Sequence, residues 1–263
     1  MSSLLNRIQD AWARWHAIRR PTMFGTALIY QMRWGADHVR VLDMDGSLQS
    51  ATYLNDLWCN LPFPYLRNYN IAFECLPQVR TMCMLGGGGY AYPKHVIAHH
   101  DPTRIDVVEI DPAITKIARR YFYLDRLCRT YQTEKTGRLR LVCADATDYL
   151  HACARDGKRY DVILNDCYVS REPNGKLALP EGAALVRACL EPQGVYLSNV
   201  ISALEGADDE VLWRTVVALG SAFAHVMVMP SKRVEPDEID NVMVLATDGD
   251  YEPQGMIRLY DAV

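Results

Sequence analysis

The sequence lacks several features that would place it in other protein classes. No run of about 18 apolar residues occurs, so we expect no membrane-spanning helix. Lysine and arginine (28) do not outnumber aspartate and glutamate (32), and the formal charge of -4 argues against a nucleic-acid partner held by a basic surface. With 263 residues, 49% of them hydrophobic, the chain can still bury a large core.

The cysteines also lack the spacing of a metal site or of a disulfide framework. The chain has eight, scattered singly, with no Cys-x-x-Cys pair and no histidine at metal-ligand spacing. Several fall inside apolar segments, where cysteine behaves as a small hydrophobe. We therefore expect reduced core thiols, no metal and a cytoplasmic location.

The first twenty residues predict an amphipathic helix. Apolar residues recur every three to four positions from Leu4 to Ile18, and four arginines lie mostly between them. A continuous apolar stretch of the kind found in secretory signals is missing. We expect this helix, over residues 1–20, to dock on the body of the protein or on a second subunit rather than on a membrane surface.

Residues 21–78 predict a small antiparallel sheet followed by a connecting helix. Strands are expected at residues 26–34, 38–44 and 48–53. The dipeptide Asp45-Gly46 between the last two is a strong hairpin signal. Residues 57–75 are broadly helical, although Pro62 and Pro64 must break or kink the start of that helix.

From about residue 79 to residue 249 the chain alternates between strands and helices, which is typical of a parallel sheet covered on both faces. Strands are expected at residues 82–85, 105–110, 139–143, 162–165 and 195–199. Helices are expected at residues 92–100, 112–122, 145–154, 180–190 and 208–219. Two further strands, at residues 222–229 and 241–246, are joined by a short polar loop and should pair antiparallel.

These elements predict an α/β fold with a doubly wound, seven-stranded, mostly parallel sheet. An N-terminal helix and a small antiparallel sheet precede it, and residues 250–263 form a C-terminal tail. The directly joined terminal strands resemble the Rossmann-like fold of class I methyltransferases more than the six-stranded dinucleotide fold.

The strongest functional signal is a run of four glycines, Gly86 to Gly89, directly after a predicted strand. Glycines let a ligand approach the backbone closely, because no side chain intervenes. Glu109 ends the next strand, where an acidic residue can bind a ribose. The run also satisfies the Gly-x-Gly-x-x-Gly/Ala pattern of dinucleotide enzymes, and a plain strand-to-helix turn is a further alternative.

Two more carboxylates, Asp145 and Asp166, follow the third and fourth strands of the alternating region. Ligands of open α/β sheets bind beyond the carboxyl ends of the strands, so we expect the glycines and the three carboxylates to face one cleft. Glu109 can accept both ribose hydroxyls, Asp145 can accept the adenine amino group, and Asp166 can lie near an amine and a sulfonium. So many carboxylates favour an S-adenosyl sulfonium ligand over an anionic pyrophosphate.

These motifs resemble those of spermidine synthases, which transfer an aminopropyl group from decarboxylated S-adenosylmethionine to a diamine. The resemblance runs from about residue 42 to residue 150 and covers residues 45–49, 84–88, 108–111 and 145–146; residues 160–166 match the strand before the catalytic loop. It implies S-adenosylmethionine or its decarboxylated form as co-substrate, and a homodimer. The cofactor-binding residues that it implies are Gln49, Gly86, Gly87, Gly88, Glu109, Ile110, Asp145 and Ala146.

The sequence departs from the family's pattern at two acidic positions. The glycine loop of the family continues with an aspartate that helps to hold the donor, whereas this chain has Gly89. The family's proposed base for the attacking amine is an aspartate at the position of Val169. Asp166 is therefore the expected catalytic carboxylate, and we expect Tyr90, Tyr92 and Tyr168 to shape the acceptor site.

Three functions stay open at this point. The first is aminopropyl transfer to a small-molecule amine other than putrescine, and the second is methyl transfer from intact S-adenosylmethionine to a small molecule. In the second case Gly89 would leave room for the donor's carboxylate. The third is a non-catalytic nucleoside-binding or assembly protein. Residues 170–179 predict either a lid over the ligand or a plain surface connection.

Overall fold

The computed structural model describes residues 12–169, 172–173, 176–230 and 234–261, and the chain forms two compact units. The first unit comprises Met1–Pro64 and Gly87–Cys143. The second comprises Tyr65–Gly86 and Ala144–Val263. The domain boundaries expected from the sequence stay predictions.

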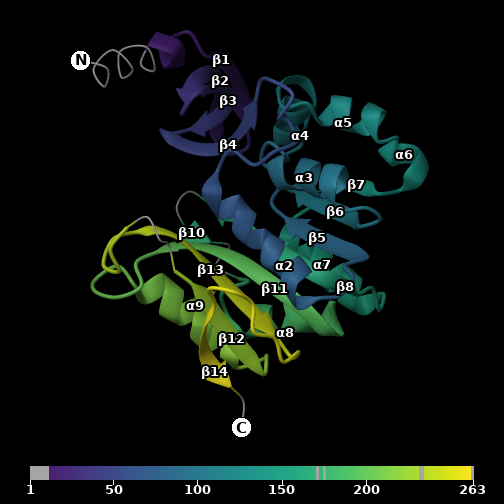
Figure 1. Cartoon of the computed structure of the whole chain (residues 1–263), viewed down its shortest axis with the longest axis vertical. Coiled ribbons are helices and arrows are strands. Elements are labelled where there is room, and N and C mark those ends of the chain that lie inside the picture. Colours follow the sequence, from purple (N-terminus) through teal and green to yellow (C-terminus); the bar gives the residue numbers. More distant parts are fainter. Residues whose placement is uncertain (1–11, 170–171, 174–175, 231–233, 262–263) are drawn as a thin grey trace. The chain divides into compact units, whose positions relative to one another are not determined.

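The first unit contains a four-stranded antiparallel sheet in the order β1-β2-β3-β4 (Figure 1). Its strands are β1 (Ile18–Thr22), β2 (Gly25–Trp34), β3 (Asp37–Met44) and β4 (Ser47–Tyr53). The three predicted strands are confirmed. The predicted helix is wrong from Ile18 onward, because the backbone there pairs with β2, with Ile18 opposite Ile29. Residues 12–15 are helical, and residues 1–11 lie outside the described residues.

Asp43 fixes the hairpin that leads into β4. The Gly46 backbone N–H donates to its Oδ1 over 2.9 Å, and the Tyr30 hydroxyl donates to its Oδ2 over 3.0 Å. The Arg14 Nε lies 3.1 Å from the same Oδ2, so this buried carboxylate is paired. Positive φ angles at Asp45 (52°) and Gly46 (86°) form the tight turn that Asp-Gly predicts.

The α/β part of the first unit is built on two parallel strands, β6 (Arg104–Glu109) and β7 (Leu139–Cys143), with Glu109 opposite Cys143. Its helices are α3 (Ala91–His99), α4 (Pro112–Tyr121), α5 (Leu124–Thr130) and α6 (Thr133–Thr136). The start of α4 is as expected, because Pro112 takes the first turn and Asp111 Oδ1 accepts from the Ala113 N–H over 2.8 Å.

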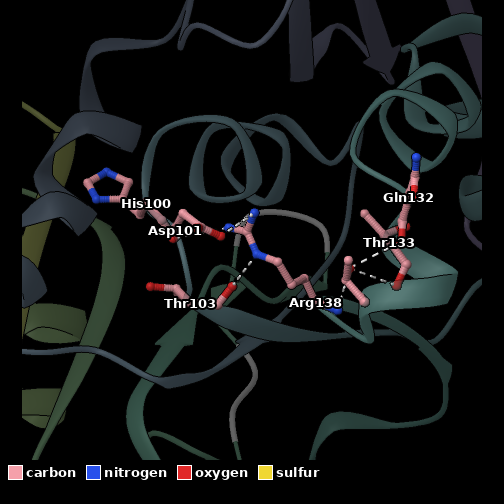
Figure 2. Close-up of polar contacts among 7 residues, drawn as sticks. His100, Asp101, Thr103, Gln132, Thr133 and Arg138 are labelled. Carbon is pink, nitrogen blue, oxygen red and sulfur yellow. Dashed lines mark hydrogen bonds and ion pairs between the residues drawn. The ribbon is translucent and has the colours of Figure 1, made fainter.

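Arg138 ties the start of β7 to the turn after α3, as Figure 2 shows. Its guanidinium donates to the backbone carbonyls of His100 (3.1 Å) and Thr103 (3.2 Å). It also lies 3.0 Å from the Asp101 carboxylate. The unpredicted helices α5 and α6 therefore end at an anchored strand rather than in a free loop.

The second unit contains six strands, which lie in the order β14-β12-β13-β11-β8-β5. The strands are β5 (Thr81–Leu85), β8 (Tyr160–Asn165), β11 (Leu190–Ser202), β12 (His225–Met229), β13 (Asp240–Thr247) and β14 (Ile257–Asp261). The pairs β5·β8 and β8·β11 are parallel, whereas β13, β12 and β14 join antiparallel. The mostly parallel α/β fold and its antiparallel end are thus confirmed.

The expected count of seven strands is wrong, because β14 forms where a tail was expected. It pairs with β12, which places Ile257 opposite Val228 and Tyr260 opposite Val226. Residues 257–261 hold no long apolar run, and their strand state depends on pairing with β12, which is distant in the sequence.

One helical segment is shorter than the sequence predicts. The helix expected over residues 57–75 forms only from Pro64 onward, as a 3-10 helix, η1 (Pro64–Asn70), followed by α2 (Ile71–Cys75). Pro62 and Pro64 prevent a continuous helix before that point. The other helices are α7 (Ala146–Arg155), α8 (Pro180–Ala188) and α9 (Glu210–Gly220), each close to its expected place. Two short strands pair with each other, β9 (Tyr168–Val169) directly before the expected lid and β10 (Glu172–Pro173) within it; residues 170–171 and 174–175 lie outside the described residues.

All eight cysteines are free thiols, and five of them are buried. In the part of the chain that the structure describes, no helix has both the length and the apolar character needed to cross a bilayer. The same residues hold no cluster of three or more side chains suited to binding a metal ion.

Candidate functional site

In the first unit, the carboxylate of Glu109 is bound by three backbone N–H groups. The Gly87 and Gly88 N–H groups donate to Oε2 over 2.9 and 3.2 Å, and the Asp111 N–H donates to Oε1 over 2.9 Å. Only 8% of Glu109 is exposed. The glycines after β5 and the tip of β6 are therefore joined through one side chain.

The environment of Glu109 is suited to a single additional donor. Burial raises the pKa of this carboxyl, while the bonds from Asp111, Gly87 and Gly88 oppose that rise. A carboxylate offers about four acceptor positions, of which three are taken, so one position on Oε1 can accept a further hydroxyl. This geometry fits one ribose hydroxyl, where the sequence suggested two.

Gly89 has no room for a side chain. A Cβ at this position would lie 2.5 Å from Ser50 Oγ and 3.0 Å from Phe122 Cδ1. Gly88, with φ of +48°, runs close to the backbone of Gln49, whose carbonyl oxygen would be 3.7 Å from a Cβ. Ser50 and Phe122 thus occupy the space that a side chain at position 89, where the resembling family has an aspartate, would take in this chain.

Tyr90 and Tyr92 are fully buried in the first unit. Tyr90 has a left-handed backbone (φ 58°), and its hydroxyl is 2.9 Å from Thr115 Oγ1 on α4. Its ring lies against Gly87, where a Cβ would come within 2.9 Å of it. Burial raises the pKa of Tyr90 to about 12 and that of Tyr92 further. The Tyr90 ring thus packs against the glycine loop, and a role of Tyr90 and Tyr92 in the acceptor site stays a prediction. Ile110, which is also predicted to bind the nucleoside, is 37% exposed.

Replacing Glu109 by glutamine is expected to lower the affinity for an S-adenosyl nucleoside about tenfold or more. The amide nitrogen cannot accept from the loop N–H groups or from a hydroxyl, and a hydrogen bond to a charged group contributes about 1.5 to 3 kcal/mol. Titration calorimetry with S-adenosylhomocysteine measures the change. Asp106→Asn, the same chemical change on the same strand β6, is the control. Equal affinity of Glu109→Gln and wild type would contradict the prediction that Glu109 binds the ribose.

In the second unit, Asp166 lies directly after β8 and both of its carboxylate oxygens accept hydrogen bonds. The Tyr65 hydroxyl donates to Oδ2 over 3.2 Å, and Asn199 Nδ2 donates to Oδ1 over 3.2 Å. Burial raises the pKa of this carboxyl, and hydrogen bonds from Asn199, Tyr65 and Tyr69 oppose the rise. The sequence did not reveal Tyr65 or Asn199, which lie 101 and 33 positions from Asp166.

Asn199 offers an unused acceptor beside this carboxylate. The residue is 3% exposed, and its Nδ2 also donates to Asn241 Oδ1 over 3.0 Å. Its Oδ1 is buried and has no hydrogen-bond partner among the described residues. The hydroxyl of Tyr168 donates to the Asn199 carbonyl, which places Tyr168 in the same cluster. An unsatisfied buried acceptor next to a carboxylate suits a ligand that brings N–H donors.

Gly86 allows β5 and β8 to end side by side. The Asp166 N–H donates to the Leu85 carbonyl over 2.9 Å, which continues the parallel pairing by one residue. Gly86 has φ of +92°, and a Cβ there would lie 2.6 Å from the Asp166 carbonyl oxygen. The absence of a side chain at Gly86 therefore determines where Asp166 lies.

Asp145 begins α7 as its N-cap. Its Oδ1 accepts from the N–H groups of Thr147 (2.8 Å) and Asp148 (3.1 Å), and Ala146 after it is buried. No hydrogen bond to Oδ2 occurs within the described residues, so this oxygen is available to an amino group. The sequence predicted the helix start, and the structure adds that one oxygen is committed to it.

Comparison with known proteins identifies the family to which this chain belongs. The family model described as the spermine/spermidine synthase domain matches residues 69–230, which is more than half of the chain. The polyamine aminopropyltransferase of Vibrio vulnificus is 26% identical over 163 residues, covering 62% of this chain and 52% of that protein. The human eEF1A lysine and N-terminal methyltransferase is 30% identical over 157 residues, covering 56% and 21%.

The fold has counterparts among solved structures. A probable spermidine synthase from Corynebacterium glutamicum superposes with a TM-score of 0.72 at 17% identity, covering 90% of this chain and 81% of the other. At that identity the likeness concerns the fold. The chain spans about half the length of the bacterial relative and about a fifth of the human one. The match over residues 69–230 shows that the chain belongs to the spermine/spermidine synthase domain family.

Proposed function

We propose that this protein transfers an aminopropyl group from decarboxylated S-adenosylmethionine to a small-molecule amine. The observation that carries the proposal is the cluster of Asp166 with the buried, unpartnered Oδ1 of Asn199. Among the described residues no cation pairs with either of these two acceptors, and an amine is a ligand that supplies the missing donors. Tyr65 and Tyr168 supply aromatic surface around it, which suits a cationic amine.

The donor would be held by residues that the family resemblance selects. We assign Gln49, Gly87, Gly88, Glu109 and Ile110 to the nucleoside, with one ribose hydroxyl on Glu109 Oε1. Gly86 supplies close backbone approach, and Asp145 Oδ2 with Ala146 is assigned to the adenine. Each of the two assignments rests on its own residue, because Glu109 in the first unit and Asp145 in the second unit each leave one acceptor position open.

The chemistry requires a proton acceptor, because an aliphatic amine is protonated near neutral pH. Asp166 takes this proton, the amine nitrogen then attacks the donor carbon next to sulfur, and the carbon–sulfur bond breaks with its electron pair remaining on sulfur. Methylthioadenosine is the second product. With Val169 at the position of the family's proposed base, Asp166 performs this task alone, and its raised pKa brings it closer to that of a useful base.

Methyl transfer is the second candidate, and Gly89 is the observation that favours it. Ser50 and Phe122 exclude an acidic side chain at this position, so the like-charge repulsion that a donor carboxylate would meet there is missing. Intact S-adenosylmethionine would then donate its methyl group, with S-adenosylhomocysteine as the product.

Product analysis tests both candidates. We expect purified protein, incubated with decarboxylated S-adenosylmethionine and a panel of diamines and longer amines, to form methylthioadenosine measured by chromatography. S-adenosylhomocysteine formed from the intact donor would instead establish methyl transfer. Binding of either nucleoside without any product would leave the non-catalytic function. The homodimer, the cytoplasmic location and the absence of a nucleic-acid partner stay predictions.

A further inference from the structure

Lys94 is a buried cation in the first unit. It lies on α3, five residues after Gly89, and only 1% of it is exposed. No ion pair joins it to a carboxylate within the described part of the chain. Lysine is almost never fully buried unless it is paired, so we expect the Lys94 side chain to have a specific structural role.

The Lys94 ammonium makes two hydrogen bonds to segments far away in the sequence. It donates to Thr52 Oγ1 on β4 over 2.8 Å and to the Phe122 carbonyl over 3.0 Å. The Thr52 hydroxyl in turn donates to the Trp58 carbonyl over 3.3 Å. Phe122 is the C-cap of α4, where a carbonyl lacks a helical partner and the helix dipole favours a positive charge.

The same two segments crowd the glycine loop. Ser50, two residues before Thr52, and the ring of Phe122 are the groups that would meet a Cβ at Gly89. Gln49, on the same strand, borders Gly88. Lys94 thus joins, from the helix that follows the loop, both of the segments that press on the loop.

We propose that Lys94 is a positioning residue that holds β4 and the end of α4 against Gly88 and Gly89, and so shapes the nucleoside-binding loop. The effect on donor affinity rests on the proposed function, whereas the effect on the two segments does not. Lys94 touches no reacting atom in this scheme.

Burial makes the charge of Lys94 sensitive to pH, and the Cys59 thiol opposes that effect. The Cys59 thiol and the Tyr123 ring, 5.9 Å from Nζ, face it from the loop before η1 and from the start of α5. Arg126, whose guanidinium is 4.5 Å from the Trp58 ring, is a further cation of the cluster. The rings of His95 and His99, also on α3, lie tilted against each other with centroids 4.7 Å apart. Burial lowers the pKa of Lys94 to about 7.

The sign of the resulting stability change follows from this shift. The folded protein binds fewer protons than the unfolded chain between about pH 7 and the ordinary lysine pKa of 10.5, so folding stability attributable to Lys94 rises with pH across that window. Lys94→Met lacks the group, and we expect its unfolding temperature to rise less between pH 7 and pH 9 than that of the wild type.

Hydrogen exchange on the free protein tests the positioning role. In Lys94→Met we expect amide exchange to become at least about threefold faster in β4 (residues 47–53), at the end of α4 (residues 119–122) and in the loop (residues 87–90), while the rest of the first unit is unchanged. The unfolding temperature at pH 7 should stay within about 3 °C of wild type, because removing a buried charge offsets two lost hydrogen bonds. Thr52→Val removes one of the two bonds from the opposite side and should give a smaller change of the same kind, which covers the case in which Lys94→Met does not fold. Lys116→Met, an exposed lysine on α4, is the control.

Calorimetry with S-adenosylhomocysteine adds the functional readout. We expect Lys94→Met to bind at least about fivefold more weakly than wild type and Lys116→Met to bind equally well. Unchanged exchange in β4, at the end of α4 and in residues 87–90, in both Lys94→Met and Thr52→Val, would overturn the inference. Faster exchange together with a wild type that binds no S-adenosyl nucleoside would uphold the positioning role and refute the proposed function instead.

Discussion

Asp166→Asn is expected to reduce turnover by about 100- to 10,000-fold, the range for loss of a positioned general base. The substitution is close to isosteric, and its amide oxygen can still accept from Asn199, so the fold should be retained. An amide cannot take the proton of the attacking amine. Steady-state formation of methylthioadenosine measures the loss, and calorimetry should show nucleoside binding within about threefold of wild type.

The pH profile separates a base from a merely structural carboxylate. Burial raises the pKa of Asp166, and the group acts only when deprotonated, so wild-type kcat should fall as pH decreases through that raised pKa. The residual activity of Asp166→Asn should lack this acidic limb. Asp156→Asn, an exposed carboxylate at the end of α7, is the matched control. Turnover of Asp166→Asn within threefold of wild type would remove Asp166 from the chemistry.

Gly86→Ala should be the most destabilising single methyl group that can be added near the site. A side chain at φ of +92° is strained by about 1 to 2 kcal/mol, and overpacking adds about 1 to 3 kcal/mol. The clashing atom is the Asp166 carbonyl oxygen, which cannot withdraw without lengthening the 2.9 Å bond from the Asp166 N–H to Leu85. We expect a loss of about 2 to 5 kcal/mol in the free energy of unfolding, measured by urea titration.

Gly157→Ala isolates the backbone part of that loss. Gly157 also has a positive φ (+67°), but nothing lies within 4 Å of a Cβ there. It should cost only the strain, about 1 to 2 kcal/mol. If Gly86→Ala costs no more than Gly157→Ala, the close approach of β5 and β8 does not depend on the missing side chain.

Local signals in the sequence predicted the elements whose limits are set locally. Asp111-Pro112 predicted the start of α4 because capping and the fixed proline φ act within one turn. Asp45-Gly46 predicted the β3–β4 hairpin for a similar reason. In contrast, Ile18 continues the apolar helical spacing that starts at Leu4, and the strand state of Ile18–Thr22 depends on pairing with β2.

The candidate site was predicted to the extent that it lies at strand ends. Glu109 ends a strand, and Asp145 and Asp166 each follow one, as expected; each of the three accepts hydrogen bonds from backbone or side-chain groups there. Tyr65 was missed because it follows two prolines, Pro62 and Pro64, and lies far from Asp166 in the sequence. Asn199 had a usable signal, since a lone asparagine within the apolar strand β11 is costly unless it has a task.

The crowding at Gly89 also bears on how the chain could change over time. Ser50 Oγ lies where a Cβ would be, so a mutation to aspartate at position 89 arises in a background that rejects it. A change at Ser50 to glycine first removes the nearest obstacle and is tolerable by itself, because it only deletes atoms. An aspartate at position 89 is thus expected to arise only after the side chain at position 50 has become smaller. The residues at positions 50 and 89 of a related chain show whether these two substitutions have occurred.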